Sequence, residues 1–295
     1  MTLFDNFFEE QAIERIKKFS RIATKLGFKP AVGFSGGKDS VVLYHLCKRA
    51  QIDFDAFFNH CFESATTLKF IRENFPDVKW RRFVPEGFFV NIKKNHAGML
   101  PTVKAAYCCD DYKHNSKKID AAVITGVRAE ESISRRQRRV FGIKNKTIKK
   151  KNLFFSNYFT ENCTELGESS VIALRPLLDW SSENIWNYIK KYNLPVNPTY
   201  KECSRVGCVI CPKANFNGNY KALLKMPKLI DAAIKACEGH VDFKINSIDL
   251  DLSDNKPLYV CYWLNYSFRQ FSAKQKKLVD MVLDNYKKSN SQNNI

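Results

Sequence analysis

Short apolar runs alternate with amphipathic helical patterns up to about residue 175 of this 295-residue chain. Apolar runs bounded by turn residues are typical of strands that are buried on both faces of a parallel sheet. Strands that alternate with helices indicate a doubly wound α/β fold with a parallel sheet. We expect strands at 30–34, 54–59, 78–83, 121–126 and 171–174, and helices at 8–26, 41–46 and 65–74.

The sequence pattern changes after Pro176. A helical pattern over 183–192 is followed by a loop rich in Pro, Gly and Cys over 193–212, and then by a second helical pattern over 220–237. The polar tail 287–295 is expected to fray. We therefore predict an α/β domain over 1–198 and a smaller, mainly helical C-terminal region over 199–295 that carries the cysteine loop.

A glycine-rich hexapeptide lies between the first predicted strand and the helix after it: Ser35-Gly36-Gly37-Lys38-Asp39-Ser40. Backbone amides and the positive helix end can hold an anion there. The paired glycines allow close approach to phosphate oxygens, and the lysine adds a positive charge. Asp39 either caps an amide or holds Mg²⁺, and Ser40 offers a hydroxyl to phosphate. The glycine spacing is wrong for a Walker A loop, so this is a different phosphate loop.

The hexapeptide resembles the signature of the PP-loop ATP pyrophosphatases. This resemblance implies that the loop grips the β,γ-pyrophosphate of ATP while a substrate oxygen attacks the α-phosphate, which yields an adenylated intermediate and free pyrophosphate. It also implies ATP and Mg²⁺ as cofactors, with Lys38 and Asp39 as catalytic residues and Ser35 to Ser40 as the nucleotide-binding loop.

Three further segments come in the order seen in the phosphoadenosine phosphosulfate reductase branch of that superfamily. They are Thr125 to Ser132, Leu174 to Trp180 and Tyr200 to Pro212, and with the hexapeptide they span roughly residues 28–215. Gly126 at a strand end permits close approach to a nucleotide, and Arg128, expected to be catalytic, can contact phosphate or sulfate through two hydrogen bonds. Asp179-Trp180-Ser181 resembles a helix entry of the family and is expected to cap and pack.

The hexapeptide departs from the reductases of this branch, which act on an already adenylated substrate and usually lack Gly-Gly-Lys-Asp. Retention of Lys38 and Asp39 resembles the ATP-using members, namely sulfate adenylyltransferase small subunits, DNA phosphorothioation pyrophosphatases and tRNA thiolases. The reductases also carry a catalytic cysteine in Glu-Cys-Gly-x-His. Because the nearest string here is Cys237-Glu238-Gly239-His240, we expect Cys237 to be an ordinary cysteine at a helix end.

Cys208 and Cys211 have the spacing of a chelating pair, because two intervening residues let both sulfurs face one zinc ion or iron–sulfur cluster. Cys203 lies five residues before Cys208, and Cys108 and Cys109 lie about 100 residues earlier. The family resemblance implies a [4Fe–4S] cluster, with zinc or metal-free thiols as alternatives.

Four ligands are needed for such a cluster, and five candidates exist. Cys109, Cys208 and Cys211 are expected to be ligands, and the fourth is either Cys108 or Cys203. Whichever of these two is not a ligand can accept or deliver sulfur. The remaining cysteines without partner spacing are expected to be buried: Cys47, Cys61, Cys163 and Cys261.

The chain carries 48 basic and 30 acidic residues, a net charge of +18. Such an excess either favours polyanionic partners or gives a soluble, lysine-rich surface. Half of it lies in Arg135 to Lys151, which holds four Arg and five Lys and no acidic residue. A block of like charge is usually a mobile loop. Aromatic residues follow it, so it is either a loop that contacts nucleic acid or a flap over the nucleotide.

The first 11 residues lack a secretory signal, and no apolar run reaches the roughly 20 residues that cross a bilayer. We therefore expect a cytoplasmic protein that does not engage a membrane. Three functions fit the sequence. The first is an adenylating enzyme for nucleic-acid thiolation, of DNA or tRNA, supplied by a sulfur donor such as a cysteine desulfurase. The others are a reductase of adenylyl or phosphoadenylyl sulfate, and a non-enzymatic module that senses nucleotides or redox state and binds nucleic acid.

Overall fold

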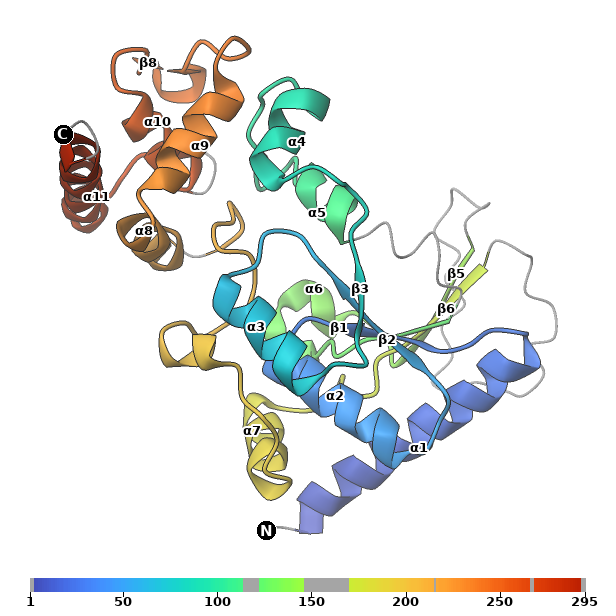
Figure 1. Cartoon of the computed structure of the whole chain (residues 1–295). Coiled ribbons are helices and arrows are strands. Elements are labelled where there is room, and N and C mark those ends of the chain that lie inside the picture. The colour runs from blue at the N-terminus through green and yellow to red at the C-terminus, as the bar shows by residue number, and fades with distance from the viewer. Residues whose placement is uncertain (1–2, 114–121, 146–169, 215, 266–267, 293–295) are drawn as a thin grey trace. The chain divides into compact units, whose positions relative to one another are not determined.

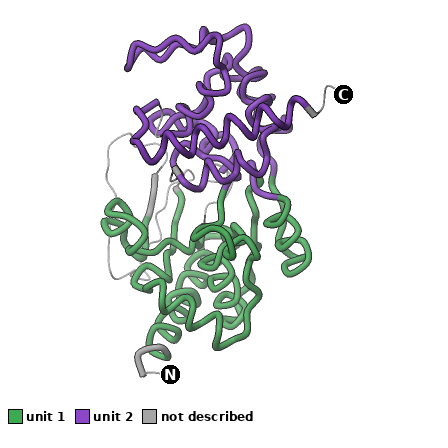
Figure 2. Tube along the Cα trace, turned by 90° about the vertical axis from the view of Figure 1, so that its left-hand side faces the viewer, with its two compact units in different colours: residues 1–60, 65–81, 114–207 green, residues 61–64, 82–113, 208–295 purple. Residues whose placement is uncertain are grey.

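The computed structural model describes residues 3–113, 122–145, 170–214, 216–265 and 268–292. The chain divides into two compact units (Figure 2). Unit 1 comprises residues 1–60, 65–81 and 114–207, and unit 2 comprises 61–64, 82–113 and 208–295. Two segments from the N-terminal half of the chain therefore belong to the same unit as the C-terminal region.

Unit 1 is built on a six-stranded sheet with the order β3-β2-β1-β4-β6-β5 (Figure 1). The strands are β1 (Ala31–Phe34), β2 (Asp55–Asn59), β3 (Lys79–Arg81), β4 (Ala122–Ile124), β5 (Phe141–Asn145) and β6 (Ser170–Leu174). Neighbouring strands pair in parallel from β3 to β6, with Ala31 opposite both Asp55 and Val123. The predicted doubly wound parallel sheet is confirmed, and β5 adds an antiparallel strand at its edge.

The edge strand β5 comes from the basic block. Residues 141–145 of that block pair with β6, so this part of it is a strand and not a loop. Residues 146–151 lie outside the described part of the chain.

Helices surround the sheet of unit 1 (Figure 1). They are α1 (Leu3–Lys25), α2 (Lys38–Arg49), α3 (Ala65–Asn74), α6 (Ile133–Arg136) and α7 (Ser182–Lys191), with the 3₁₀ turns η2 (Ala129–Glu131) and η3 (Pro198–Lys201). Among the apolar residues of α1, Ala12, Ile16 and Phe19 are fully buried, and Ile13 is partly buried. They share one hydrophobic core with the apolar residues of β1 and α2.

The entry to α7 is a capping box. The Ser181 hydroxyl accepts a hydrogen bond from the Asn184 amide at 3.0 Å, and the Ser181 amide donates to the Asn184 side chain at 2.8 Å. The preceding Trp180 is buried in the core. The expectation that this segment caps and packs is therefore confirmed.

Unit 2 is mainly helical in the residues described. Its elements are α4 (Phe88–Asn95), α5 (Tyr107–Tyr112), α8 (Phe216–Lys225), α9 (Lys228–Cys237), α10 (Lys256–Trp263) and α11 (Ala273–Gln292), with the short strands β7 (Lys244–Ile245) and β8 (Leu250–Asp251) and the turn η4 (Asn246–Ile248). Its core holds the fully buried Tyr220 and Trp263. The Trp263 indole donates to the carbonyl of Pro101 at 2.6 Å.

Two sequence expectations for unit 2 are wrong. The single helix over 220–237 is two helices, because Pro227 has no amide to continue α8 and instead forms the N-cap of α9. The tail is helical from residue 287 to Gln292, because it continues α11, which buries Val279 and Val282. No helix within the described ranges combines the length and apolarity that a membrane span requires.

Candidate functional site

The phosphate loop lies at the topological switch point of the sheet. β1 and β4 are neighbours in the sheet, although β2 and β3 come between them in the chain. The segments that follow these two strands therefore meet beyond their carboxyl ends, which is where open α/β sheets bind ligands. One of these segments is Ser35 to Gly37, and the other begins with Thr125 and Gly126.

Gly36 shapes the loop. Its φ of +72° is a left-handed conformation that side chains disfavour, and a Cβ here would lie 2.9 Å from the side chain of Ile71. Gly37 is the N-cap of α2 and makes no side-chain capping hydrogen bond. Because Gly36 and Gly37 have no side chains, the backbone just before the first turn of α2 is not covered by side chains of its own.

Ser35 and Ser40 brace the loop internally. The Ser40 hydroxyl donates to the Gly37 carbonyl at 2.8 Å, and it accepts from the Ser35 amide at 3.2 Å. The Ser35 hydroxyl accepts from the Gly37 amide at 3.4 Å. Ser40 is buried, so in this conformation its hydroxyl stabilises the turn.

Three charged side chains meet at the start of α2. The Lys38 ammonium lies 3.1 Å from both carboxylate oxygens of Asp39. The same carboxylate accepts a hydrogen bond from Arg128 Nε at 2.5 Å. Lys38 and Arg128 are both buried, with 8% and 5% of their surface exposed. Asp39 is thus held between two cations, and these contacts place it in an ion-pair network.

Two glutamates hold Arg128 from the other side. Its Nη1 donates to Glu130 at 2.6 Å, and its own amide donates to Glu131 at 3.0 Å. Burial by itself lowers the pKa of Arg128, but the Asp39 and Glu130 carboxylates outweigh burial and raise it. The Ser182 amide and the Arg128 guanidinium lower the pKa of Glu130. Arg128 is therefore a fixed positive charge beside the phosphate loop.

Gly126 allows a close backbone contact. A Cβ at this position would lie 3.0 Å from the carbonyl oxygen of Asp39. The segment after β4 can therefore pass directly over the first turn of α2 only because Gly126 has no side chain. The expected close approach is present, and its partner in this structure is the main chain of α2.

Sequence reasoning missed two residues of this site. Asn197 is buried and donates to the Gly36 carbonyl at 3.1 Å, and Tyr200 accepts a hydrogen bond from the Lys38 amide at 2.9 Å. Burial raises the pKa of Tyr200 to about 12, so its phenol stays protonated. Both residues frame η3, more than 150 residues after the loop in the chain. The sequence signal available was the Asn-Pro pair, which marks the start of a turn.

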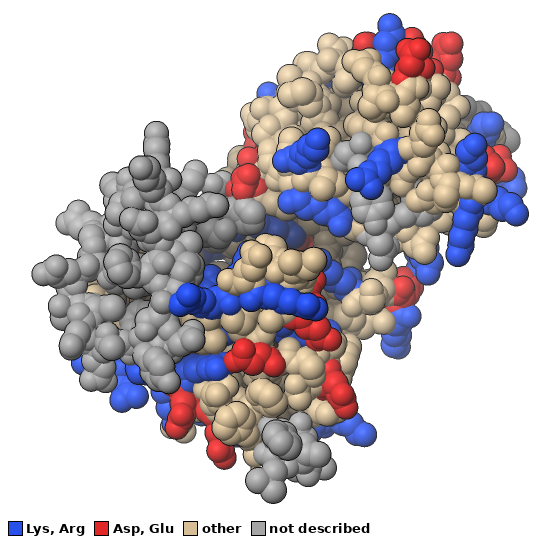
Figure 3. Space-filling model, turned by 180° about the vertical axis from the view of Figure 1, so that it is seen from behind, with Lys and Arg blue, Asp and Glu red and all other residues tan. Residues whose placement is uncertain are grey.

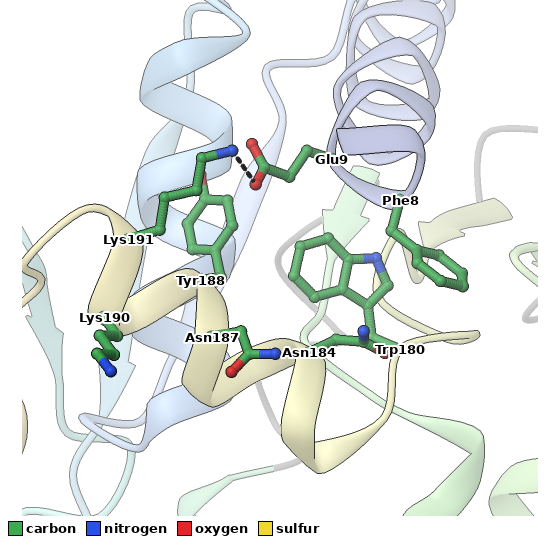
Figure 4. Close-up of a pocket in the computed structure, with 8 residues that line it drawn as sticks. All are labelled: Phe8, Glu9, Trp180, Asn184, Asn187, Tyr188, Lys190 and Lys191. Atoms are coloured by element: carbon green, nitrogen blue, oxygen red, sulfur yellow. Dashed lines mark hydrogen bonds and ion pairs between the residues drawn. The ribbon is translucent and has the colours of Figure 1, made fainter. Parts of the chain in front are cut away.

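A pocket of about 450 Å³ lies elsewhere in unit 1, between α1 and α7 (Figure 4). Phe8, Trp180 and Tyr188 form its aromatic wall, and Asn184, Asn187 and Lys190 contribute polar groups. Glu9 lies at its rim, where Lys191 binds its carboxylate at 2.7 Å. No residue of the phosphate loop lines this pocket, so it is separate from the candidate nucleotide site.

Unit 2 brings four of the five predicted ligand cysteines together. Cys108 and Cys109 belong to α5, and Cys208 and Cys211 follow at the start of the C-terminal part of the unit. A hydrogen bond with Cys109 and burial raise the pKa of Cys108, and the Cys208 and Cys211 thiols lie close enough to raise it further. Cys203 belongs to unit 1.

A fifth thiol, from Cys61, lies in the same cluster. Its Sγ is 3.8 Å from that of Cys208, and Lys113 Nζ is 3.3 Å from Cys208 Sγ. The hydrogen bond with Cys61 and the Lys113 charge lower the pKa of Cys208 to about 7, while that of Cys61 is raised. The expectation that Cys61 is simply buried missed this contact.

The donor chemistry of these cysteines fits an iron–sulfur cluster. Soft thiolate sulfurs are the ligands that such clusters take, and Lys113 supplies positive charge beside them. Among the described residues, no three His, Cys, Asp or Glu side chains form a group that could hold a metal ion. The fit therefore rests on donor type and on the shared unit, not on a finished coordination geometry.

Three further cysteines are buried, whereas Cys203 is partly exposed. Cys47, Cys237 and Cys261 are at most 1% exposed, and burial raises the pKa of each. Cys237 ends α9, as expected for an ordinary helix-end cysteine. Cys163 lies outside the described residues.

On the face that Figure 3 shows, positive charge is dispersed. Figure 3 shows one face on which Lys and Arg lie among acidic and uncharged side chains. Within the basic block, Arg135 pairs with Glu131. Arg175 donates to the Arg139 carbonyl at 2.8 Å and contacts the edge strand at Gly142.

A doubly wound sheet with a glycine-rich loop and a buried arginine at its switch point is the arrangement in which many α/β proteins bind nucleotides. The phosphoadenosine phosphosulfate reductase domain model matches residues 29–214, and the chain belongs to that family. This match confirms the resemblance inferred from the motifs.

Curated relatives agree with this assignment. An uncharacterised protein of Methanocaldococcus jannaschii is 27% identical over 242 residues, which are 77% of this chain and 44% of that protein. This chain thus spans less than half of that relative. Sulfate adenylyltransferase subunit 2 of Rhizobium tropici is 27% identical, covering 67% of this chain and 68% of the relative. Adenosine 5'-phosphosulfate reductase of Bacillus mycoides is 26% identical, covering 60% and 70%.

Proposed function

We propose that this protein is a PP-loop ATP pyrophosphatase that adenylates its substrate for sulfur transfer, with nucleic acid as the acceptor. The observation that carries the proposal is the cationic phosphate loop at the switch point. Lys38, with Asp39 and Arg128 around it, lies where the amides and positive end of α2 favour an anion. Family membership and the relationship to a sulfate adenylyltransferase subunit support it.

The reaction forms one bond and breaks one. An oxygen of the acceptor attacks the α-phosphorus of ATP, the bond from that phosphorus to the β-phosphate oxygen breaks, and pyrophosphate leaves with the electron pair. Sulfur then displaces AMP from the activated acceptor. Charge that develops on the departing pyrophosphate requires donors that are already in place.

Residues of unit 1 provide such donors. Lys38 supplies a mobile ammonium to the β- and γ-phosphates, and Arg128 supplies a fixed guanidinium. Asp39 holds these two cations together and is the carboxylate available to Mg²⁺, which would neutralise phosphate charge when bound. Gly36 and Gly126 keep the main chain close enough for this arrangement.

The cysteines of unit 2 complete the proposal. Cys108, Cys109, Cys208 and Cys211 would hold a [4Fe–4S] cluster, which would bind or deliver the sulfur. Zinc is the alternative metal for these ligands. Lys113 would place a positive charge beside the Cys208 sulfur.

Pyrophosphate release tests the first half of the proposal. ATP is incubated with the protein and with tRNA, duplex DNA or sulfate in turn, and one acceptor should stimulate release. Lys38→Ala should abolish this release. Lys48→Ala, on the exposed side of the same helix where Lys48 pairs with Asp77, is the matched control and should behave as wild type. Normal turnover by Lys38→Ala would contradict the proposal.

The nucleic-acid acceptor is tested through the basic block. Changing Arg135, Arg136, Arg138 and Arg139 to Gln should weaken binding of the acceptor and flatten its salt dependence while ATP binding persists. The matched control changes four exposed lysines of α11, namely Lys274, Lys276, Lys277 and Lys287. Loss of ATP affinity in the arginine variant would instead assign the block to a flap over the nucleotide.

Reduction of adenylyl or phosphoadenylyl sulfate is the second candidate, and the family match itself favours it. A reductase needs a reactive cysteine, whereas Cys237 is buried and its pKa is raised to about 12. Incubation with adenylyl sulfate and a thiol donor, followed by a sulfite assay, separates the two functions.

A further inference from the structure

We propose that Cys61 is a fifth sulfur ligand of the cysteine cluster and can take the place of Cys208 on the metal centre. This inference rests on the proposed cluster in unit 2. It assigns a role to a residue whose sequence context gives no spacing signal.

Backbone contacts hold Cys61 beside Cys208. The segment 61–64 belongs to unit 2, where Glu63 forms an antiparallel bridge with Cys208 and the Val209 amide donates to the Phe62 carbonyl at 2.8 Å. These main-chain interactions fix the separation of the two cysteine segments. The 3.8 Å between the two Sγ atoms is therefore set by the fold and not by chance side-chain rotation.

Two charged side chains, Glu63 and Lys113, lie beside this pair of thiols. Glu63 accepts a hydrogen bond from the Cys61 amide at 2.8 Å and binds Lys113 at 3.3 Å. Lys113 Nζ in turn lies 3.3 Å from Cys208 Sγ. Glu63 is buried, whereas the Lys113 side chain is 34% exposed. Lys113 thus links the segment of Cys61 and Glu63 to the Cys208 sulfur and helps to hold the two cysteines side by side.

Distance makes the replacement possible. The Cys61 sulfur is 3.8 Å from the Cys208 sulfur, so a small change in a side-chain torsion would bring it towards the position that the Cys208 sulfur occupies. Among the described contacts, neither of the buried residues Cys47 and Cys261 lies against another thiol. Cys203 belongs to the other unit. Cys61 is accordingly the best candidate for the replacing ligand.

The test measures iron and labile sulfide per chain and the visible absorbance of the cluster after anaerobic purification. Cys208→Ala should keep most of the wild-type iron. Cys61→Ala/Cys208→Ala should hold roughly tenfold less. Two matched pairs, Cys203→Ala/Cys208→Ala and Cys261→Ala/Cys208→Ala, should equal Cys208→Ala alone. Circular dichroism verifies folding, and Cys61→Ser/Cys208→Ala repeats the measurement if the alanine pair does not fold.

Other outcomes would overturn the inference. If Cys208→Ala loses iron as completely as the double variant, Cys61 does not replace it. If Cys203→Ala/Cys208→Ala loses iron and Cys61→Ala/Cys208→Ala does not, Cys203 is the replacing ligand. A wild-type protein without iron would remove the cluster proposal together with this inference. ATP-dependent pyrophosphate release, measured separately, would still decide whether unit 1 performs the proposed adenylation.

Discussion

Arg128 Nε lies 2.5 Å from Asp39 Oδ1, and this ion pair joins the segment after β4 to the first turn of α2. The two residues are 89 positions apart in the chain. Gly126 permits the contact, because a side chain there would meet the main chain of Asp39. The pair therefore links the two segments that follow the neighbouring strands β1 and β4.

Replacing Arg128 by Lys should impair this site. Arg128 contacts Asp39 through Nε and Glu130 through Nη1, and a single ammonium cannot reproduce this fork. Loss of charge-assisted hydrogen bonds of about 1.5–3 kcal/mol should reduce ATP-dependent pyrophosphate release by roughly 10- to 100-fold. Arg72→Lys is the control, since that guanidinium lies over the Trp80 ring. Equal activity of both variants would show that the fork is not needed.

The loop conformation predicts a difference between two glycine variants. Gly36 and Gly27 have almost the same φ, +72° and +74°, but only at Gly36 does a Cβ meet a neighbour, the Ile71 side chain at 2.9 Å. Gly27→Ala should cost about 1–2 kcal/mol of unfolding free energy from the left-handed conformation. Gly36→Ala should lower the unfolding free energy by a further amount of about 1–3 kcal/mol, because its Cβ overpacks against Ile71. Urea denaturation measures both, and equal losses would exclude the contact with Ile71.

Local patterns explain which parts of this fold could be predicted. The hexapeptide, its strand and its helix are contiguous, so glycine content and apolar periodicity sufficed to locate them. Helices α8 and α9 were merged because the apolar periodicity continues through Pro227, although the proline ends the hydrogen-bond pattern. β5 was hidden because its charge suggested a loop, whereas pairing with β6 stabilises it.

The site residues that the sequence did not predict come from segments far away in the chain. Asn197 reaches the Gly36 carbonyl across 161 positions, and Cys61 reaches Cys208 across 147. No local spacing carries either contact, because both depend on how the chain folds back on itself. The spacing to Cys211 pointed to Cys208 and the family-like segment pointed to Arg128, but the contacts of these two residues required the structure.

Tyr200→Phe should strengthen anion binding at the loop. The Tyr200 hydroxyl accepts from the Lys38 amide at 2.9 Å, and that amide is one of those that a phosphate would use. Removing the hydroxyl frees the amide, and a hydrogen bond of about 0.5–1.5 kcal/mol corresponds to roughly 2- to 10-fold tighter binding of pyrophosphate. Isothermal titration calorimetry measures this, with Tyr188→Phe as the control because Tyr188 contacts His45 instead. Weaker binding would mean that the hydroxyl itself contacts the phosphate.

Glu9 should make the free energy of unfolding of unit 1 depend on pH. Its buried carboxylate binds Arg49 at 2.9 Å, Lys191 at 2.7 Å and the Tyr192 hydroxyl at 2.7 Å. Burial alone would raise its pKa, but these hydrogen bonds outweigh burial and lower it below the usual 4.5. A depressed folded-state pKa stabilises the fold above the unfolded-state value, and this stabilisation is lost as the pH falls through the folded-state value.

Glu9→Gln should therefore lower the free energy of unfolding by about 1–3 kcal/mol near neutral pH, because two cations lose their partner. The gap to wild type should begin to narrow as the pH falls below about 4.5, and it should close once the pH lies below the lowered pKa of the folded wild-type carboxyl. Urea denaturation across this range measures the gap. Glu73→Gln, which removes an exposed ion pair with Lys69, should change little at any pH. A gap that stays constant in acid would show that Glu9 acts through packing and not through its charge.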